Sequence, residues 1–290
     1  MQKQRPSKVL VHLLDVPLSD EFPILFYYST QKNNDRNKLH HHNSFEIGIC
    51  IEGSGAFFIE SKVISFNAGD ISFIYPNQPH IAQSPGELPS RWIFMHVDLN
   101  VLFFGNSLIV KQIWECKRRV PHILTASHCA DLPDIVKITV GELESQEQHY
   151  QLAVKELIMV FLYKLLRLQS PDMASPSTTS NEYYSVMPAL AYIAQNYELE
   201  ISINDLAQAC NLSETHFRAL FKEAMGRTPK QYLSYVRIEM AKTLLKSTDY
   251  PVLSIAQGVG YDSISSFNRT FISLYGITPS AYRRQYAQGR

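Results

Sequence analysis

The feature that most constrains the fold is a duplication within the last 90 residues of the 290-residue chain. When residues 205–232 are set against residues 254–282, Ala207-Gln208 matches Ala256-Gln257 at an offset of 49 residues. The later matches have an offset of 50 residues: Phe217 with Phe267, Phe221 with Phe271, Gly226 with Gly276, Thr228-Pro229 with Thr278-Pro279, and Tyr232 with Tyr282. A match that keeps its phase over this length predicts two copies of one small helical unit.

Each copy has the signals of a short helix, a tight turn and a second helix. In the first copy Asn204 is expected to cap the short helix, and Asn211-Leu212 to form the turn. Ser213 is expected to cap the second helix. In the second copy the turn lies at residues 258–261, and Asp262 or Ser263 caps the second helix. Two helices joined in this way form a helix-turn-helix unit, which many DNA-binding proteins use.

The second helix of each unit has an apolar face and a small-polar face. The apolar face holds the paired phenylalanines and is expected to pack in the core. The opposite face holds the candidate base-reading residues, which are Thr215, Arg218, Ala219, Ile264, Ser265, Asn268 and Arg269. Arginine can bridge two acceptors on guanine, asparagine can pair with adenine, and small apolar groups pack on thymine. We expect Ser213, Lys222 and Ser263 to contact phosphates.

The helix between the two units is expected to run from Thr228-Pro229 to about Lys246. Its length of roughly 25 Å would hold the two reading helices about one DNA turn, ~34 Å, apart. Residues 201–290 have 11 Lys and Arg against 6 Asp and Glu, a net charge of +5, and residues 1–200 have a net charge of −5. This asymmetry is usual for a nucleic-acid binder that carries a regulatory domain. The alternative for the duplication, a helical array for protein contacts, is disfavoured because the exposed faces of the two units are basic and small-polar instead of apolar.

Residues 184–286 resemble the DNA-binding domain of the AraC/XylS family of bacterial transcription regulators. The second unit, SIAQGVGYDSISSFNRTFISLYGITPSAYRR, carries the most specific stretch, and the connecting helix carries the family's Arg and Ala as Arg237 and Ala241. One departure is Ile272, which stands where the family usually has a basic residue and is expected to weaken backbone contact there. The resemblance implies double-stranded promoter DNA and RNA polymerase as partners, and favours activation of a catabolic operon such as one for carbohydrate use.

The N-terminal part has a different pattern. Short segments rich in Ile, Val, Phe and Tyr predict strands near residues 24–28, 45–51, 56–59, 63–66, 70–75 and 92–97, hence a small antiparallel barrel or sandwich. From residue 107 the period becomes helical, and residues 150–169 form one long amphipathic helix. Its apolar face could cover the barrel, meet a second chain, or do both.

These patterns predict an α+β protein of two domains. Residues 1–168 are expected to form a cupin-like, effector-binding and dimerisation domain, with the antiparallel barrel at about 9–99 and helices at about 107–168. Residues 169–182, rich in Pro, Ser and Thr, are expected to be a linker, and residues 183–290 an all-α domain with two helix-turn-helix units. No run approaches the 18 or so apolar residues of a membrane span, and no secretory signal is recognisable. With four widely separated cysteines, we expect a cytoplasmic protein with reduced thiols.

Nine of the ten histidines precede residue 150. His40, His42 and Glu46 resemble the first cupin motif, and residues 69–80, which end at His80, resemble the second. The match is imperfect, because no glycine lies six residues before His40 and the second motif is one residue short. In metal-binding cupins such residues converge on one ion. AraC-family barrels, in contrast, are implied to bind a small effector, commonly a sugar, without metal.

We therefore expect an effector pocket without a metal or other cofactor. The predicted effector contacts are His40, His42, Glu46, His80, Tyr27, Tyr75 and Trp92, and the first four are the candidate ligands if an ion is bound. A metal site and purely structural roles are the two alternatives for this cluster.

The leading hypothesis is a non-enzymatic, homodimeric regulator in which an effector changes how the paired domains meet DNA. A second hypothesis is a metal-dependent cupin enzyme fused to a DNA-binding domain, which bound iron or manganese and turnover would favour. A third is a constitutive architectural DNA binder with a silent barrel, whose DNA affinity no small molecule would alter. The sequence has no phosphate-binding glycine loop, Gly-x-Ser-x-Gly elbow or zinc-protease helix.

Overall fold

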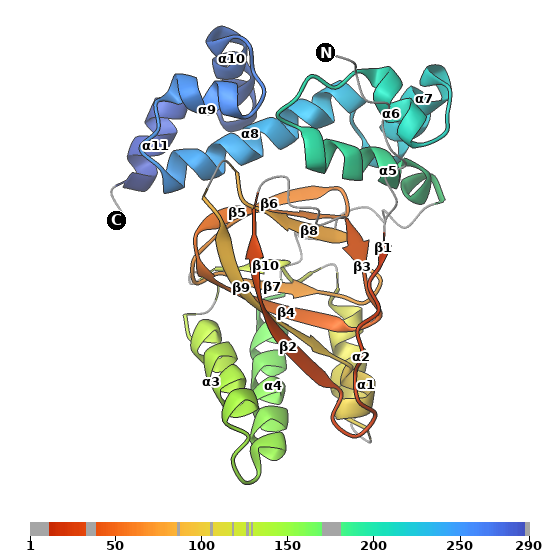
Figure 1. Cartoon of the computed structure of the whole chain (residues 1–290), viewed down its shortest axis with the longest axis vertical. Coiled ribbons are helices and arrows are strands. Elements are labelled where there is room, and N and C mark those ends of the chain that lie inside the picture. Colours follow the sequence, from red (N-terminus) through yellow and green to blue (C-terminus); the bar gives the residue numbers. More distant parts are fainter. Residues whose placement is uncertain are drawn as a thin grey trace.

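The computed structural model describes residues 12–32, 39–85, 88–104, 107–117, 119–125, 128, 130–169 and 181–287. Over these residues the chain forms a β domain with associated helices, followed by a helical domain (Figure 1). The predicted α+β class is thus confirmed. Most of the expected linker, residues 170–180, and Cys129 lie outside the described residues. A membrane-spanning helix, judged by length and hydropathy, was not found in the described part.

Two five-stranded sheets form the β domain. The first has the order β1 (His12–Leu13), β3 (His40–His41), β8 (His80–Gln83), β5 (Ser54–Ile59) and β6 (Lys62–Asn67). The second has the order β10 (Ile123–Leu124), β7 (Ile71–Ile74), β4 (Phe45–Glu52), β9 (Ser90–Val97) and β2 (Ile24–Gln31). The six predicted strand segments correspond to β2, β4, β5, β6, β7 and β9. The others were missed because runs of two to four residues are too short to show an alternating pattern.

Helices cover the outer face of the second sheet. They are α1 (Leu99–Leu102), α2 (Ser107–Glu115), α3 (Leu132–Ser145) and α4 (Tyr150–Arg167), and Figure 1 shows α3 and α4 side by side below the barrel. Phe161 and Leu162 of α4 are buried in the same core as Phe45 and Phe73 of the sheet. The amphipathic helix predicted at residues 150–169 therefore covers the barrel with its apolar face.

The helical domain consists of α5 (Asn181–Asn196), α6 (Ile203–Ala209), α7 (Glu214–Met225), α8 (Pro229–Ser247), α9 (Val252–Gly258), α10 (Ile264–Tyr275) and α11 (Pro279–Ala287). The pairs α6–α7 and α9–α10 are the two predicted units, and α8 connects them. Ser213 caps α7 as predicted, accepting a hydrogen bond from the His216 amide. The prediction for Asn204 was wrong. Ser202 caps α6 and forms a capping box with Asp205, which leaves Asn204 inside the helix.

The duplication recurs in the details of the two units. Phe217 and Phe221 are completely buried, as are Phe267 and Phe271 (0% exposed each). Helices α7 and α10 both end at a left-handed glycine, Gly226 with φ of 66° and Gly276 with φ of 72° in the second unit. Glycine is favoured there because a Cβ atom strains the left-handed conformation. The repeated residues are thus those that the local geometry requires.

Arg237 of α8 links the two units. Its guanidinium donates hydrogen bonds to the backbone oxygens of Tyr197 and Leu199, both at 2.7 Å. It also approaches the turn of the second unit, where a Cβ atom at Gly260 would lie 2.9 Å from the guanidinium and 2.8 Å from the Glu198 oxygen. Gly260 has a φ of +91°, so both space and backbone conformation require glycine. This network joins the segment between α5 and α6 to the turn of the second unit.

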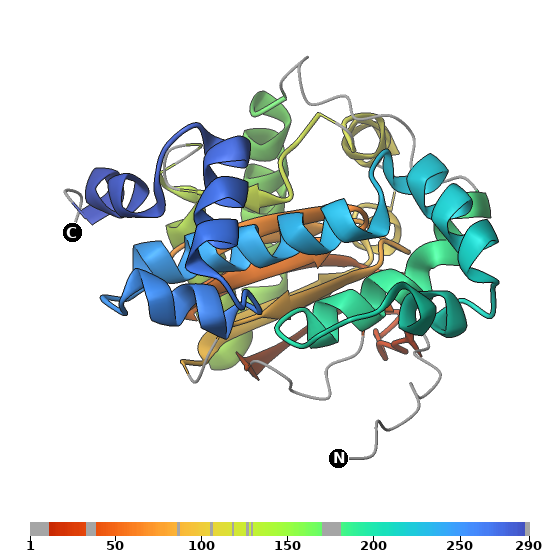
Figure 2. The same ribbon diagram turned by 90° about the horizontal axis from the view of Figure 1, so that it is seen from above.

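The helical domain packs directly on the barrel. Seen from above, α8 lies over the first sheet and runs roughly along its strands (Figure 2). The Tyr235 hydroxyl donates a hydrogen bond to the Val63 oxygen, and the Thr243 hydroxyl donates to the Gly55 oxygen, both at 3.2 Å. Five apolar residues of the β domain share one buried cluster with the core of the helical domain, namely Leu39, Ala56, Phe58, Val63 and Ile81. The two domains are therefore joined by an apolar interface.

Candidate functional site

A cavity of about 340 Å³ opens in the barrel and is lined by strands of both sheets. The residues that line it are His12, Leu14, Tyr27, Ser29, Gln31, His40, Glu46, Phe57, His80, Ile81, Ala82 and Phe94. Tyr27, His40, Glu46 and His80 are thus placed at the cavity where the sequence predicts them. His42, also predicted as an effector contact, is buried and is not among the lining residues. The mixture of a few polar groups with aromatic and aliphatic walls is typical of a small-molecule site.

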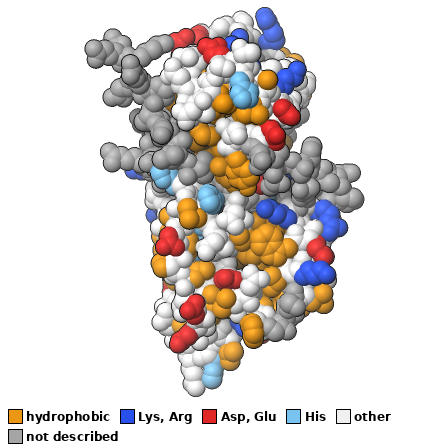
Figure 3. Space-filling model, turned by 90° about the vertical axis from the view of Figure 1, so that its right-hand side faces the viewer, with side chains coloured by type: hydrophobic (Ala, Val, Ile, Leu, Met, Phe, Trp, Pro, Cys, Tyr) orange, Lys and Arg blue, Asp and Glu red, His pale blue; other side chains and the backbone are white. Residues whose placement is uncertain are grey.

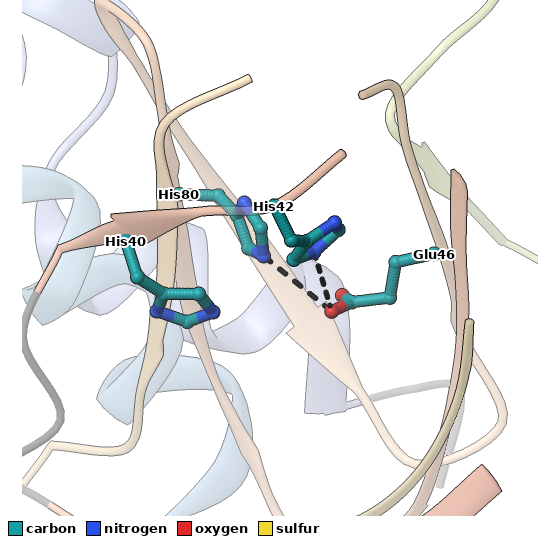
Figure 4. Close-up of side chains that lie close together, drawn as sticks. All are labelled: His40, His42, Glu46 and His80. Carbon is teal, nitrogen blue, oxygen red and sulfur yellow. Dashed lines mark hydrogen bonds and ion pairs between the residues drawn. The ribbon is translucent and has the colours of Figure 1, made fainter. Parts of the chain in front are cut away.

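His40, His42, Glu46 and His80 come together although three separate segments supply them (Figure 4). Each offers one nitrogen or oxygen atom, and these four atoms all lie within 4.8 Å of one another. The Glu46 Oε2 atom is 3.3 Å from His42 Nε2 and 3.5 Å from His80 Nε2. His40 is half-buried and pairs with His80 across β3 and β8, whereas the other three are buried.

Backbone carbonyls orient two of these imidazole rings. His42 Nδ1 lies 3.0 Å from the Ser44 oxygen, and His80 Nδ1 lies 2.8 Å from the Gln78 oxygen. Because a carbonyl oxygen only accepts hydrogen bonds, each Nδ1 carries the hydrogen. The Nε2 atoms of both rings therefore face the Glu46 carboxylate.

Burial and the neighbouring groups of the cluster have opposite effects on the pKa values of Glu46 and His80. Burial acts to raise the pKa of Glu46, but the charge of His80 and hydrogen bonds with His42 and His80 outweigh it and hold that pKa well below its usual range. Burial acts to lower the pKa of His80, but the charge of Glu46 and its hydrogen bond raise it overall. An ionised carboxylate thus lies among imidazoles inside the barrel, where positive charge beside it stabilises the ionised form.

His96 is part of the site but was not predicted from the sequence. It lies opposite Glu46 in the pairing of β4 with β9, and its Nε2 atom is 3.7 Å from Glu46 Oε2 and 3.3 Å from the Tyr27 hydroxyl. Its Nδ1 atom is 3.0 Å from the Ser44 hydroxyl. Burial lowers the pKa of His96 to about 4 despite the opposing charge of Glu46. Only the register of β4 against β9 could have identified this residue.

Tyr75 and Trp92 do not line the cavity, so the prediction that they contact the effector there was wrong. The Tyr75 hydroxyl donates to the Ile113 oxygen at 3.0 Å, and its ring packs on Trp114 beneath the helices. Trp92 is completely buried among other aromatic rings, and its Nε1 atom donates to the Ser90 hydroxyl at 3.1 Å. Aromatic character alone could not distinguish core residues from pocket residues.

The second candidate site is the surface formed by α7 and α10. In Figure 1 these helices lie at opposite ends of α8, on the side turned away from the barrel. Of the predicted base-reading residues, Thr215, Arg218, Ala219, Ser265 and Arg269 are exposed, and Ile264 and Asn268 are half-buried. The three predicted phosphate contacts, Ser213, Lys222 and Ser263, are exposed as well. All of these side chains are therefore at least partly accessible to a duplex.

This surface is not uniformly basic. The side view in Figure 3 shows Lys and Arg side chains of the helical domain among Asp and Glu side chains. Arg218, for example, lies 3.4 Å from the exposed Glu214 carboxylate. Ile272 in α10, the departure noted in the sequence, is 42% exposed. Recognition of DNA by such a surface depends on a few well-placed side chains more than on overall charge.

Comparison with known proteins finds a match for each of the two domains. Residues 206–285 match a family model described as a helix-turn-helix domain, and residues 22–162 match one described as an AraC-like ligand binding domain. The chain is 40% identical over 290 residues to the MmsAB operon regulatory protein of Pseudomonas aeruginosa, covering 98% of this chain and 90% of that protein.

Two further relatives are named for sugar operons. The chain is 26% identical over 243 residues to the lactose operon transcription activator of Staphylococcus xylosus, covering 82% of this chain and 83% of that protein. It is 27% identical over 262 residues to the melibiose operon regulatory protein of Escherichia coli, covering 87% of this chain and 85% of that protein.

Proposed function

The chain belongs to the AraC/XylS family of transcription regulators, and we propose that it is a dimeric cytoplasmic activator controlled by a small molecule in the barrel. The observation that carries this proposal is the presence, in one chain, of a cavity with polar groups and of two helix-turn-helix units, in domains that share an apolar interface. In this account the protein acts on promoter DNA and RNA polymerase, and the barrel serves regulation instead of catalysis. Selection of genomic DNA by the full-length protein, with and without small molecules, tests the function.

We propose a carbohydrate, used by the regulated operon, as the effector. The names of the lactose and melibiose relatives point to this class. The cavity supports it, because the Tyr27 ring lies beside the polar side chains of Ser29, Gln31 and His40. A flat ring can stack on the apolar face of a sugar while polar groups bond its hydroxyls. A volume of about 340 Å³ is at the lower end of small-molecule sites.

The first sheet offers a physical route from the cavity to the helical domain. Phe57 of β5 and Ala82 of β8 line the cavity, and the neighbouring Phe58 belongs to the cluster shared with the helical domain. Ile81 of β8 belongs to both, since it lines the cavity and is part of that cluster. Alternate residues of a strand point to opposite faces, so these two strands separate the effector from α8. We propose that an effector that fits one arrangement of β5 and β8 better than another changes how α8 is held.

Dimerisation is expected to use the outer side of α4. Leu152, Val160 and Tyr163 are 63%, 44% and 48% exposed and follow one another at helical spacing. Replacing Leu152 with glutamate should weaken self-association at least about tenfold, because a charge would enter an apolar contact. Sedimentation velocity over a concentration series measures this.

Leu253→Glu in α9 is the matched control, since Leu253 is 51% exposed and lies in the other domain. It should leave the association constant unchanged. An unchanged dimer in Leu152→Glu, or a monomeric native protein at all concentrations, would contradict this use of α4.

A further inference from the structure

We propose that His40, His42, Glu46 and His80 bind one divalent transition-metal ion at the barrel cavity. This departs from the expectation, drawn from the family resemblance, that the pocket works without metal. It also stands apart from the proposed regulatory function, because metal content can be measured without DNA or effector.

The distances within the cluster suit a shared ion. Two atoms that each lie ~2.1 Å from a tetrahedral metal ion are roughly 3.4 Å apart. The Glu46 Oε2 atom is 3.3 Å from His42 Nε2 and 3.5 Å from His80 Nε2. With His40 included, the four ligand atoms are within 4.8 Å of one another.

The hydrogen-bonding pattern leaves electron pairs directed into the cluster. Both His42 and His80 have Nδ1 directed at a backbone carbonyl, so in the neutral rings the Nε2 lone pairs face the Glu46 carboxylate. Glu46 Oε1 is buried without a hydrogen-bond partner, and the long 3.5 Å contact with Glu46 Oε2 is the one that His80 Nε2 makes within the cluster. Buried acceptors that face one another are unfavourable unless a cation or a proton lies between them.

The same carbonyl contacts have a second consequence. Metal-binding histidines usually donate their other ring nitrogen to a carbonyl or carboxylate, which fixes the ring and the tautomer. Ser44 and Gln78 provide this for His42 and His80. Three imidazoles and one carboxylate suit Mn²⁺, Fe²⁺, Co²⁺ or Zn²⁺ better than Ca²⁺ or Mg²⁺, which prefer oxygen ligands throughout.

Metal content of the untagged full-length protein tests the proposal. The protein is stripped with a chelator, dialysed separately against Mn²⁺, Fe²⁺ under anaerobic conditions, Co²⁺ and Zn²⁺, and analysed by elemental mass spectrometry. We expect about one ion per chain with at least one of these metals, and a Co²⁺ visible absorption band typical of nitrogen and oxygen ligands. Glu46→Gln and His42→Gln should each lower metal content at least about tenfold at the same free metal concentration.

His149→Gln is the control, because His149 is exposed at the start of α4, outside the cluster. It should keep the metal content of the native protein. Less than about 0.1 ion per chain in the native protein with all four metals would overturn the proposal and leave protons as the balancing charge. Native-like metal content in both Glu46→Gln and His42→Gln would also overturn it, by placing the ion elsewhere. The native measurement decides even if a variant fails to fold, and DNA binding by the stripped protein is scored separately.

Discussion

Replacing Arg218 or Arg269 with alanine is expected to lower the affinity for the target promoter about 5- to 150-fold, or about 1 to 3 kcal/mol. Both side chains are exposed, on α7 and α10, whose paired phenylalanines are buried in the core. Each arginine can therefore reach a base edge when its helix enters a major groove. The exposed Arg218–Glu214 ion pair adds little stability, so the variants should remain folded. Fluorescence anisotropy with the selected site and its single-base variants measures the loss.

Lys222→Ala is the control for base reading. Lys222 lies one turn further along α7, where a phosphate contact is expected, so its loss should weaken binding to every sequence alike. The arginine variants should instead lose preference at one base position each. Equal losses on specific and random DNA for both arginine changes would contradict their role as base readers.

Replacing Phe58 with aspartate should release the helical domain from the barrel. Phe58 is 3% exposed and belongs to the apolar cluster shared by the two domains. An unpaired carboxylate at this position costs several kcal/mol while the domains stay docked, and little once water reaches it. We expect a larger radius of gyration in small-angle X-ray scattering and two separate transitions in calorimetry. Regulation by a small molecule should be lost, while DNA affinity is retained.

Two further variants separate docking from other effects. Ile51→Asp makes a similar change at a position that is 44% exposed at the end of β4, and should leave both domains docked. Tyr235→Phe removes only the hydrogen bond to the Val63 oxygen, which predicts a smaller effect of about 1 kcal/mol. A Phe58→Asp protein with the native radius of gyration and native regulation would show that this interface does not transmit the response.

The duplicated domain could be predicted from the sequence because its signals are local. The phenylalanines repeat because each unit buries the same face, and the glycines repeat because both reading helices end in a left-handed residue. The cap of α6 was missed because Ser202 and Asn204 are both good capping residues, and only the hydrogen bonds of Asp205 distinguish them.

The pocket could be predicted only in part. The spacing of His40, His42, Glu46 and His80 predicted that these residues lie together, because alternate strand positions share a face, and the structure does place them within one cluster. His96 depends on the register between β4 and β9, which no local pattern specifies. The packing of α8 on the first sheet could not be predicted from the sequence either, since Phe58 in β5 resembles any other core residue of a strand.

The central claim, a regulator whose DNA binding responds to a small molecule, is tested most directly by selection of sheared genomic DNA with the purified full-length protein. The selection is run at about 150 mM salt, since phosphate contacts make affinity salt-dependent, with and without a small-molecule extract of the host cells. We expect enrichment of sites that contain two recognition elements about one helical turn apart, with an occupancy that the extract alters. Recovery of no preferred sequence in either condition would contradict base reading by α7 and α10, and enrichment indifferent to the extract would contradict control by the barrel.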